Sequence, residues 1–102
     1  MTGVKPAVGT VQIETERLRV TEWRFAPGAA TGFHRHEFDY CVVPLTTGTL
    51  RIAGKAGSSE AALVAGRSYA REAGVEHDVI NANDFEFAFI EIELKEKARN
   101  DD

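Results

Sequence analysis

The chain has 102 residues, which is enough for one domain with one hydrophobic core. Apolar residues make up 43% of the sequence and charged residues 27%, the balance of an ordinary globular protein. The net charge of −4, without a stripe of lysine or arginine, argues against a partner made of nucleic acid. No apolar run approaches the roughly 20 residues that a membrane helix needs, so we expect no contact with a membrane.

The single cysteine, Cys41, excludes an intrachain disulfide and gives no sign of an oxidising compartment. Residues 1–10 contain glycine and proline but no apolar stretch of the kind found in a signal peptide or an anchor. We therefore expect a cytoplasmic protein. We divide the chain into a loose arm at 1–10, one domain at 11–94 and a charged tail at 95–102.

The region between the arm and the tail indicates β-structure. Turn-forming residues recur at short intervals, with β-branched and aromatic residues between them, which is typical of an all-β sandwich or barrel. In chain order, the expected strands are 11–14, 17–25, 33–36, 40–45, 49–53, 60–64, 68–71, 77–81 and 85–94.

The last of these strands is apolar on both faces. One face carries Phe85, Phe87 and Phe89, and the other carries Ala88, Ile90, Ile92 and Leu94. A strand that is apolar on both sides needs cover on both sides. We therefore expect a homodimer in which the second face is the subunit contact. The alternative is a sandwich that covers both faces within one chain.

The three histidines are the candidate metal ligands. His34 and His36 are separated by one residue, so on a strand both imidazoles point to the same side, as two nitrogen ligands of one metal ion would. An H-x-H pair also occurs without a metal. The hypothesis of a metal site therefore depends on the surroundings of the pair and on the third histidine, His77, which follows the turn at Ala73-Gly74.

The sequence around the three histidines resembles the two motifs of the cupin family. Its first motif reads G-x5-H-x-H-x3,4-E-x6-G, and the matching residues here are Gly28, His34, His36 and Gly48. Its second motif reads G-x5-P-x-G-x2-H-x3-N, and the matching residues are Gly66, Gly74, His77 and Asn81. The resemblance implies a single-domain double-stranded β-helix, or jelly-roll barrel, in which all three histidines bind one divalent transition metal.

The chain departs from the cupin motifs at two positions. Glu72 replaces the proline of the second motif, a loop change of small effect. The glutamate of the first motif is replaced by Cys41 or by Tyr40, depending on which spacing is counted. The nearest carboxylates are those of Glu37 and Asp39.

Three interpretations of the missing carboxylate stay open. In the first, three histidines hold the metal, Cys41 lies near it without binding, and the uncompensated charge favours an anionic small molecule; this resembles the three-histidine iron centres of the thiol dioxygenase branch of cupins. In the second, Cys41 binds as a thiolate, which favours zinc and a closed structural site. In the third, Asp39 or Glu37 replaces the glutamate, which requires an irregular turn after His36.

The candidate catalytic residues are Tyr40, Cys41 and Tyr69. The sequence does not assign a role in proton transfer to any of them. Cys41 also fits a small buried core residue, since it alternates with Val43 and Leu45. Tyr40 also fits an outward-facing packing residue. We interpret Arg35 as a surface or interface charge, and Asn81 as a residue that fixes a turn.

Two longer runs resemble a narrower group. HRHEFDYCVVPLTTGTLRI at 34–52 and GVEHDVIN at 74–81 are similar to small single-domain cupins associated with β-alanine degradation. This resemblance implies a link to the metabolism of small amino acids or carboxylic acids.

Three functions are compatible with these residues. The first is an enzyme in which iron, nickel, zinc or manganese acts on a small carboxylate, thiol or amine compound by dioxygenase-like or Lewis-acid chemistry. The second is a non-catalytic cupin that binds or senses a metal or a small ligand. The third is a metal-free scaffold whose histidines only pack. The fold alone does not choose among them.

Overall fold

The computed structural model describes residues 4–95. Within these residues it has nine strands, each overlapping one of the expected ranges. They are β1 (Val8–Glu14), β2 (Leu18–Phe25), β3 (His34–Arg35), β4 (Asp39–Pro44), β5 (Gly48–Gly54), β6 (Gly57–Leu63), β7 (Tyr69–Arg71), β8 (Glu76–Asn81) and β9 (Phe87–Leu94). No helix long and apolar enough to cross a membrane occurs in this part of the chain.

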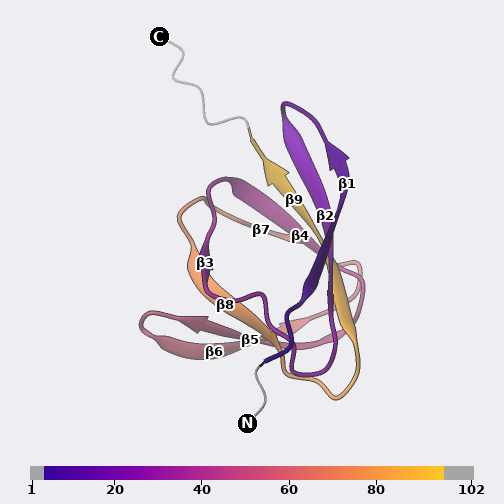
Figure 1. The fold of residues 1–102 in the computed structure, drawn as a ribbon, viewed down its shortest axis with the longest axis vertical. Coiled ribbons are helices and arrows are strands. Elements are labelled where there is room, and N and C mark those ends of the chain that lie inside the picture. Colours follow the sequence, from indigo (N-terminus) through magenta and orange to yellow (C-terminus); the bar gives the residue numbers. More distant parts are fainter. Residues whose placement is uncertain (1–3, 96–102) are drawn as a thin grey trace.

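The strands form two antiparallel sheets around a common interior (Figure 1). One sheet has the order β1-β2-β9-β4-β7, and the other has the order β3-β8-β5-β6. The β1–β2 hairpin and the β5–β6 hairpin lie on opposite sides of the molecule in Figure 1. The expected all-β, single-domain architecture is confirmed.

The core follows from the alternation of side chains along the strands. Tyr40 and Val42 of β4 are buried, as are Phe87 and Phe89 of β9, while the residues between them on β4 are more exposed. The Phe25 and Phe89 rings pack with their centroids 5.5 Å apart. Each fully buried phenylalanine contributes about 1.5–3 kcal/mol. The inner face of β9 is apolar at Phe87 and Phe89 and becomes polar at Glu91, further along the strand.

The described part of the N-terminal arm differs from the expectation of a loose segment. β1 begins at Val8 rather than at residue 11, so residues 8–10 belong to the sheet. Before it, the amide of Ala7 donates to the carbonyl of Ala30 at 2.8 Å, and the amide of Ala30 donates to the carbonyl of Lys5 at 3.0 Å. The sequence did not reveal these pairings because glycine and proline in the segment are typical of a loop. Residues 1–3 lie outside the described part.

At the other end, most of the expected charged tail, residues 96–102, lies outside the described residues. Lys95 is described and is held by the rest of the domain. Its amide donates to the carbonyl of Arg17 at 2.8 Å, and its Nζ contacts the carboxylate of Glu14 and the carbonyl of Thr15.

Phe85 does not share the buried face of β9. The strand begins at Phe87, and the Phe85 side chain is 44% exposed. The reason is the loop before β9, where Nδ2 of Asn81 donates to the Phe85 carbonyl at 2.8 Å and the Asn83 amide donates to Oδ1 of Asn81 at 2.9 Å. These hydrogen bonds confirm Asn81 as a residue that fixes a turn.

Candidate metal centre

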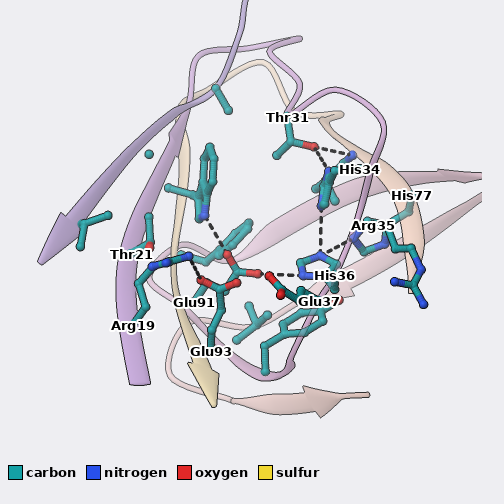
Figure 2. Close-up of a pocket in the computed structure, with 18 of the residues that line it drawn as sticks. Arg19, Thr21, Thr31, His34, Arg35, His36, Glu37, His77, Glu91 and Glu93 are labelled. Atoms are coloured by element: carbon teal, nitrogen blue, oxygen red, sulfur yellow. Dashed lines mark hydrogen bonds and ion pairs between the residues drawn. The ribbon is translucent and has the colours of Figure 1, made fainter. Parts of the chain in front are cut away.

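A cavity of about 770 Å³ opens among the inward-facing side chains of the two sheets (Figure 2). Its apolar part is formed by core residues, including Val42, Leu50, Val79 and Phe89. All three histidines line it as well. The polar end of the interior is therefore the place where a ligand could contact the imidazoles.

The backbone brings the three histidine segments together. His34 of β3 and His77 of β8 are direct partners in the antiparallel ladder. The amide of His36 donates to the carbonyl of Val75 at 2.8 Å, and the amide of Gly74 donates to the carbonyl of His36 at 2.8 Å. Gly74 has a φ of 100°, a conformation that residues with a Cβ rarely adopt. The turn before β8 thus fixes His36 against the ladder.

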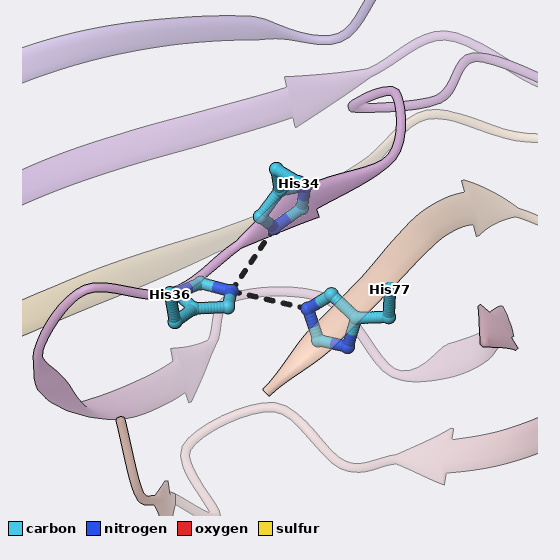
Figure 3. A group of neighbouring side chains, drawn as sticks. All are labelled: His34, His36 and His77. Carbon is cyan, nitrogen blue, oxygen red and sulfur yellow. Dashed lines mark hydrogen bonds between the residues drawn. The ribbon is translucent and has the colours of Figure 1, made fainter. Parts of the chain in front are cut away.

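The ε-nitrogens of the three rings converge (Figure 3). Nε2 of His36 lies 3.0 Å from Nε2 of His34 and 3.1 Å from Nε2 of His77. Nitrogen ligands about 2.1 Å from one ion and at right angles around it are separated by about 3.0 Å. The spacing of the three nitrogens therefore fits a shared metal ion, and the expected proximity of His77 to the His34/His36 pair is confirmed.

The contacts of the Nδ1 atoms indicate the tautomers of two of the three rings. Nδ1 of His34 donates to the carbonyl of Gly32 at 2.8 Å, so its Nε2 carries the free lone pair. Nδ1 of His36 lies 3.4 Å from a carboxylate oxygen of Glu91, which favours the same tautomer. Nδ1 of His77 is buried and has no hydrogen-bond partner within residues 4–95. Where two facing Nε2 atoms both carry a lone pair they repel, and a cation between them would stabilise the arrangement.

The electrostatic environment keeps two of the rings neutral. Burial, followed by the electrostatic interaction with the neighbouring His34 ring, lowers the pKa of His36 and that of His77 to about 4. An imidazole must be neutral to bind a metal, so both rings are in the binding form at neutral pH.

Sequence analysis missed Glu91, a carboxylate in the same cavity. Glu91 is on the inner face of β9 and is 8% exposed. Its Oε1 accepts a hydrogen bond of 2.9 Å from Nε1 of Trp23, and its Oε2 faces His36. Burial raises the pKa of Glu91 to about 7, although the hydrogen bond from Trp23 opposes the shift. The alternation from Phe87 through Phe89 to Glu91 was the signal that could have revealed it.

Two of three comparisons place the chain among known proteins. A scan against protein-family models found no match. A curated relative is the Beta-alanine degradation protein BauB of Pseudomonas aeruginosa, 57% identical over 95 residues, which are 93% of this chain and 100% of BauB. A solved cupin domain from Bordetella pertussis is 53% identical and superimposes with a TM-score of 0.92, covering 94% of this chain and 100% of that one. The chain belongs to the cupin family.

More distant cupins share the fold alone. A cupin superfamily protein from Desulfitobacterium hafniense is 16% identical, with a TM-score of 0.70 over 94% of this chain and 84% of that one. The double-stranded β-helix fold expected from the motifs is confirmed, as is the resemblance to the small cupins associated with β-alanine degradation.

The two positions that replace the cupin glutamate lie on opposite faces of β4. Tyr40 and Val42 line the cavity, so strand alternation turns Cys41 to the outer face, beside Ile92 of β9 and Ala70 of β7. Cys41 therefore lies neither in the cavity nor near the metal centre, contrary to two of the three interpretations. It is also not a core residue of the interior.

Tyr40 points inward rather than outward. Its ring stacks on the imidazole of His36, with centroids 3.9 Å apart and planes 17° apart. Burial raises the pKa of Tyr40 to about 12, so its phenol stays protonated. Tyr69 of β7 also lines the cavity, but it is partly exposed, and burial raises its pKa as well.

The acids near the histidines are not placed as ligands. Oδ1 of Asp39 accepts a hydrogen bond of 2.8 Å from the amide of Ala73, on the same outer face as Cys41. Glu37 lines the cavity but does not belong to the cluster of ligating atoms. Arg35 lies at the cavity wall, but its side chain is exposed and forms an ion pair with Glu76 at 3.6 Å, as expected for a surface charge.

Proposed function

We propose that this cupin binds one divalent transition metal through Nε2 of His34, His36 and His77. We further propose that it acts as an enzyme on a small carboxylate, thiol or amine compound. The observation that supports the metal site is the convergence of the three ε-nitrogens: that of His36 lies 3.0 Å from that of His34 and 3.1 Å from that of His77, and the ligand atoms of all three lie within 4.8 Å of one another. When bound, iron, nickel, zinc or manganese would supply Lewis-acid chemistry or, for iron, activation of oxygen.

The name of the relative favours one of these compound classes. BauB is a β-alanine degradation protein, which supports a substrate derived from a small amino acid. The cavity wall agrees, because it carries the carboxylates of Glu37, Glu91 and Glu93 in addition to the histidines. An anionic group of the substrate would face the metal, and an amino group would be favoured near the carboxylates.

The side chains around the centre have different parts in this proposal. Tyr40 holds the plane of the His36 ring through the stacking contact. Tyr69, at a more exposed part of the cavity wall, is the phenol best placed to meet a ligand that enters from solvent. Arg19 is already paired with Glu14 at 2.9 Å and with Glu93 at 3.3 Å, so it stiffens the wall.

Metal analysis of the purified protein, with His34→Ala and Arg35→Ala as a matched pair of variants, tests the metal site. We expect one equivalent of metal in the native chain and in Arg35→Ala, and none in His34→Ala. Oxygen consumption and product analysis with small thiols and amino acids then test catalysis. A native chain that binds no divalent metal would contradict the proposal.

The second candidate is a cupin that binds or senses a small ligand without chemistry. It is favoured by the state of Tyr40, whose phenol is packed on His36 and stays protonated. For this candidate, we expect a ligand to raise the melting temperature of the metal-loaded protein without formation of a product.

A homodimer and a cytoplasmic location stay predictions of the sequence. The outer face of β9 supports the first, because Ile90 and Ile92 are only partly buried there and Leu94 is exposed. Val43 of β4 and Val20 of β2 flank Ile90 and Ile92 on that face, which makes it an apolar surface for a second copy.

A further inference from the structure

The three histidines differ in how their rings are held. Nδ1 of His34 donates to a backbone carbonyl, that of Gly32, at 2.8 Å and also lies 3.3 Å from the hydroxyl of Thr31; the first contact persists whatever side chain is substituted. Nδ1 of His77 has no partner in the described part of the chain. His36 alone of the three has a carboxylate, that of Glu91, beside its Nδ1 at 3.4 Å. The orientation of His36 therefore depends on another side chain.

The stacking contact with Tyr40 cannot by itself orient His36. A ring stacked at 3.9 Å keeps its plane, but it can rotate by 180° about the Cβ–Cγ bond and remain stacked. That rotation exchanges Nδ1 with Cδ2 and Nε2 with Cε1, so a carbon would face His34 and His77. A carboxylate on the Nδ1 side favours the arrangement in which Nε2 faces the other two rings.

Glu91 is itself held in place on the other side. Its Oε1 accepts the Trp23 hydrogen bond, and this leaves Oε2 directed at His36, as Figure 2 shows for Glu91 and His36. Glu91 contacts Nδ1 and not Nε2, so it lies behind the His36 ring as seen from the cluster. It therefore does not replace the missing cupin glutamate as a ligand.

We propose that Glu91 is the positioning residue of the metal centre: it accepts the Nδ1 hydrogen of His36 and so keeps Nε2 of that ring directed at His34 and His77. This inference deepens the proposed function, since the ring that Glu91 orients is a ligand of the proposed metal. In this chain, the buried carboxylate near the metal centre is therefore that of Glu91 on β9, and it acts through His36. The glutamate of the cupin motif would instead lie on β4 and bind the metal directly.

The first test measures the dissociation constant of Zn²⁺ by competition with a chromophoric chelator. Glu91→Ala removes the acceptor, and we expect the dissociation constant to rise about 10- to 100-fold. Glu93→Ala is the matched control, because Glu93 is the next inward carboxylate on β9 but pairs with Arg19; it should bind Zn²⁺ like the native chain. Equal weakening by both variants, or none by Glu91→Ala, would overturn the proposal.

A conservative rescue separates positioning from simple loss of charge. Glutamine has one carbonyl oxygen for the two donors, Trp23 and His36, so Glu91→Gln is combined with Trp23→Phe, which removes the competing donor. We expect this double variant to bind Zn²⁺ more tightly than Trp23→Phe combined with Glu91→Ala. Equal affinities of the two double variants would contradict a hydrogen-bonding role.

The second readout needs no metal. Nitrogen-15 NMR of the histidine rings in the metal-free protein should show the proton of His36 on Nδ1 in the native chain and a mixture of tautomers in Glu91→Ala, with His34 unchanged in both. An unaltered His36 tautomer in Glu91→Ala would overturn the positioning role. A native chain that shows this tautomer but binds no Zn²⁺ would instead refute the proposed function alone.

Discussion

Replacement of Asn81 by aspartate should destabilise the fold strongly, although the two side chains have nearly the same shape. Asn81 is 1% exposed at the end of β8. Its Nδ2 lies 3.1 Å from the Phe25 carbonyl, 3.2 Å from that of Ala26 and 2.8 Å from that of Phe85. Aspartate has no N–H group, so a carboxylate oxygen would face these carbonyl oxygens.

The expected magnitude follows from the donors that are lost. Two N–H donors disappear, and each buried acceptor left without a partner costs about 1–3 kcal/mol. Asn81→Asp should therefore lower the free energy of unfolding by roughly 2–6 kcal/mol at pH 8, a large part of the stability of a typical domain. Burial raises the pKa of such a carboxyl group, and its protonated form regains one donor, so the loss should shrink as the pH falls.

Urea unfolding followed by tryptophan fluorescence measures this difference at pH 8 and pH 5. Asp84→Asn is the control, because it alters charge at an exposed position of the same loop and should change stability by less than about 0.5 kcal/mol. If Asn81→Asp were as stable as the native chain at pH 8, the proposed role of Asn81 in the β8–β9 loop would be refuted.

Three other predictions concern the metal centre. Because burial raises the pKa of Glu91 from 4.5 to about 7, its stabilising contribution is complete below pH 4.5 and is lost as the pH rises through 7. Relative to Glu91→Gln, the metal-free native chain should therefore lose roughly 3 kcal/mol between pH 4.5 and pH 8.5 in urea unfolding, and a constant difference would contradict this. Tyr40→Ala should cost roughly 3–5 kcal/mol and weaken Zn²⁺ binding, whereas Tyr40→Phe, which keeps the ring on His36, should bind Zn²⁺ normally; equal weakening by both would assign the effect to the hydroxyl. Cys41→Ser should leave the Zn²⁺ dissociation constant unchanged, since Cys41 is on the outer face of β4, and loss of metal from this variant would show that the thiol is a ligand.

The strand pattern and the histidine cluster could be predicted from sequence because both depend on local spacing. Turn residues mark the ends of each strand, and the two glycine-histidine motifs fix which strands carry His34 and His77. The start of β1 at Val8 could not be predicted in this way. The pairing of Ala7 with Ala30 is a contact between distant segments, and it overrides the loop preference of the residues before it.

The faces of β4 and the role of β9 were harder to predict. Counting from either end of the first cupin motif places the missing glutamate at Tyr40 or at Cys41, and a shift by one residue moves a side chain to the opposite face. Only the pairing of β4 with β9 decides that Tyr40 faces inward. Strand alternation could place Glu91 on the inner face of β9, but its contact with His36 could not be predicted, because the two residues are distant along the chain and no local motif links them.

The hydrogen bonds that connect β3, the His36 segment and the turn before β8 also affect how fast metal can exchange. The His34–His77 pair and the bonds that join His36 to Val75 and Gly74 fix the positions of the three ligands through the backbone, independently of an ion. An ion bound to all three rings is then released more readily when these segments move apart than when they stay paired. The rate of metal release should therefore follow the local opening rate of this corner of the barrel, as amide hydrogen exchange at His36 and Gly74 would measure it.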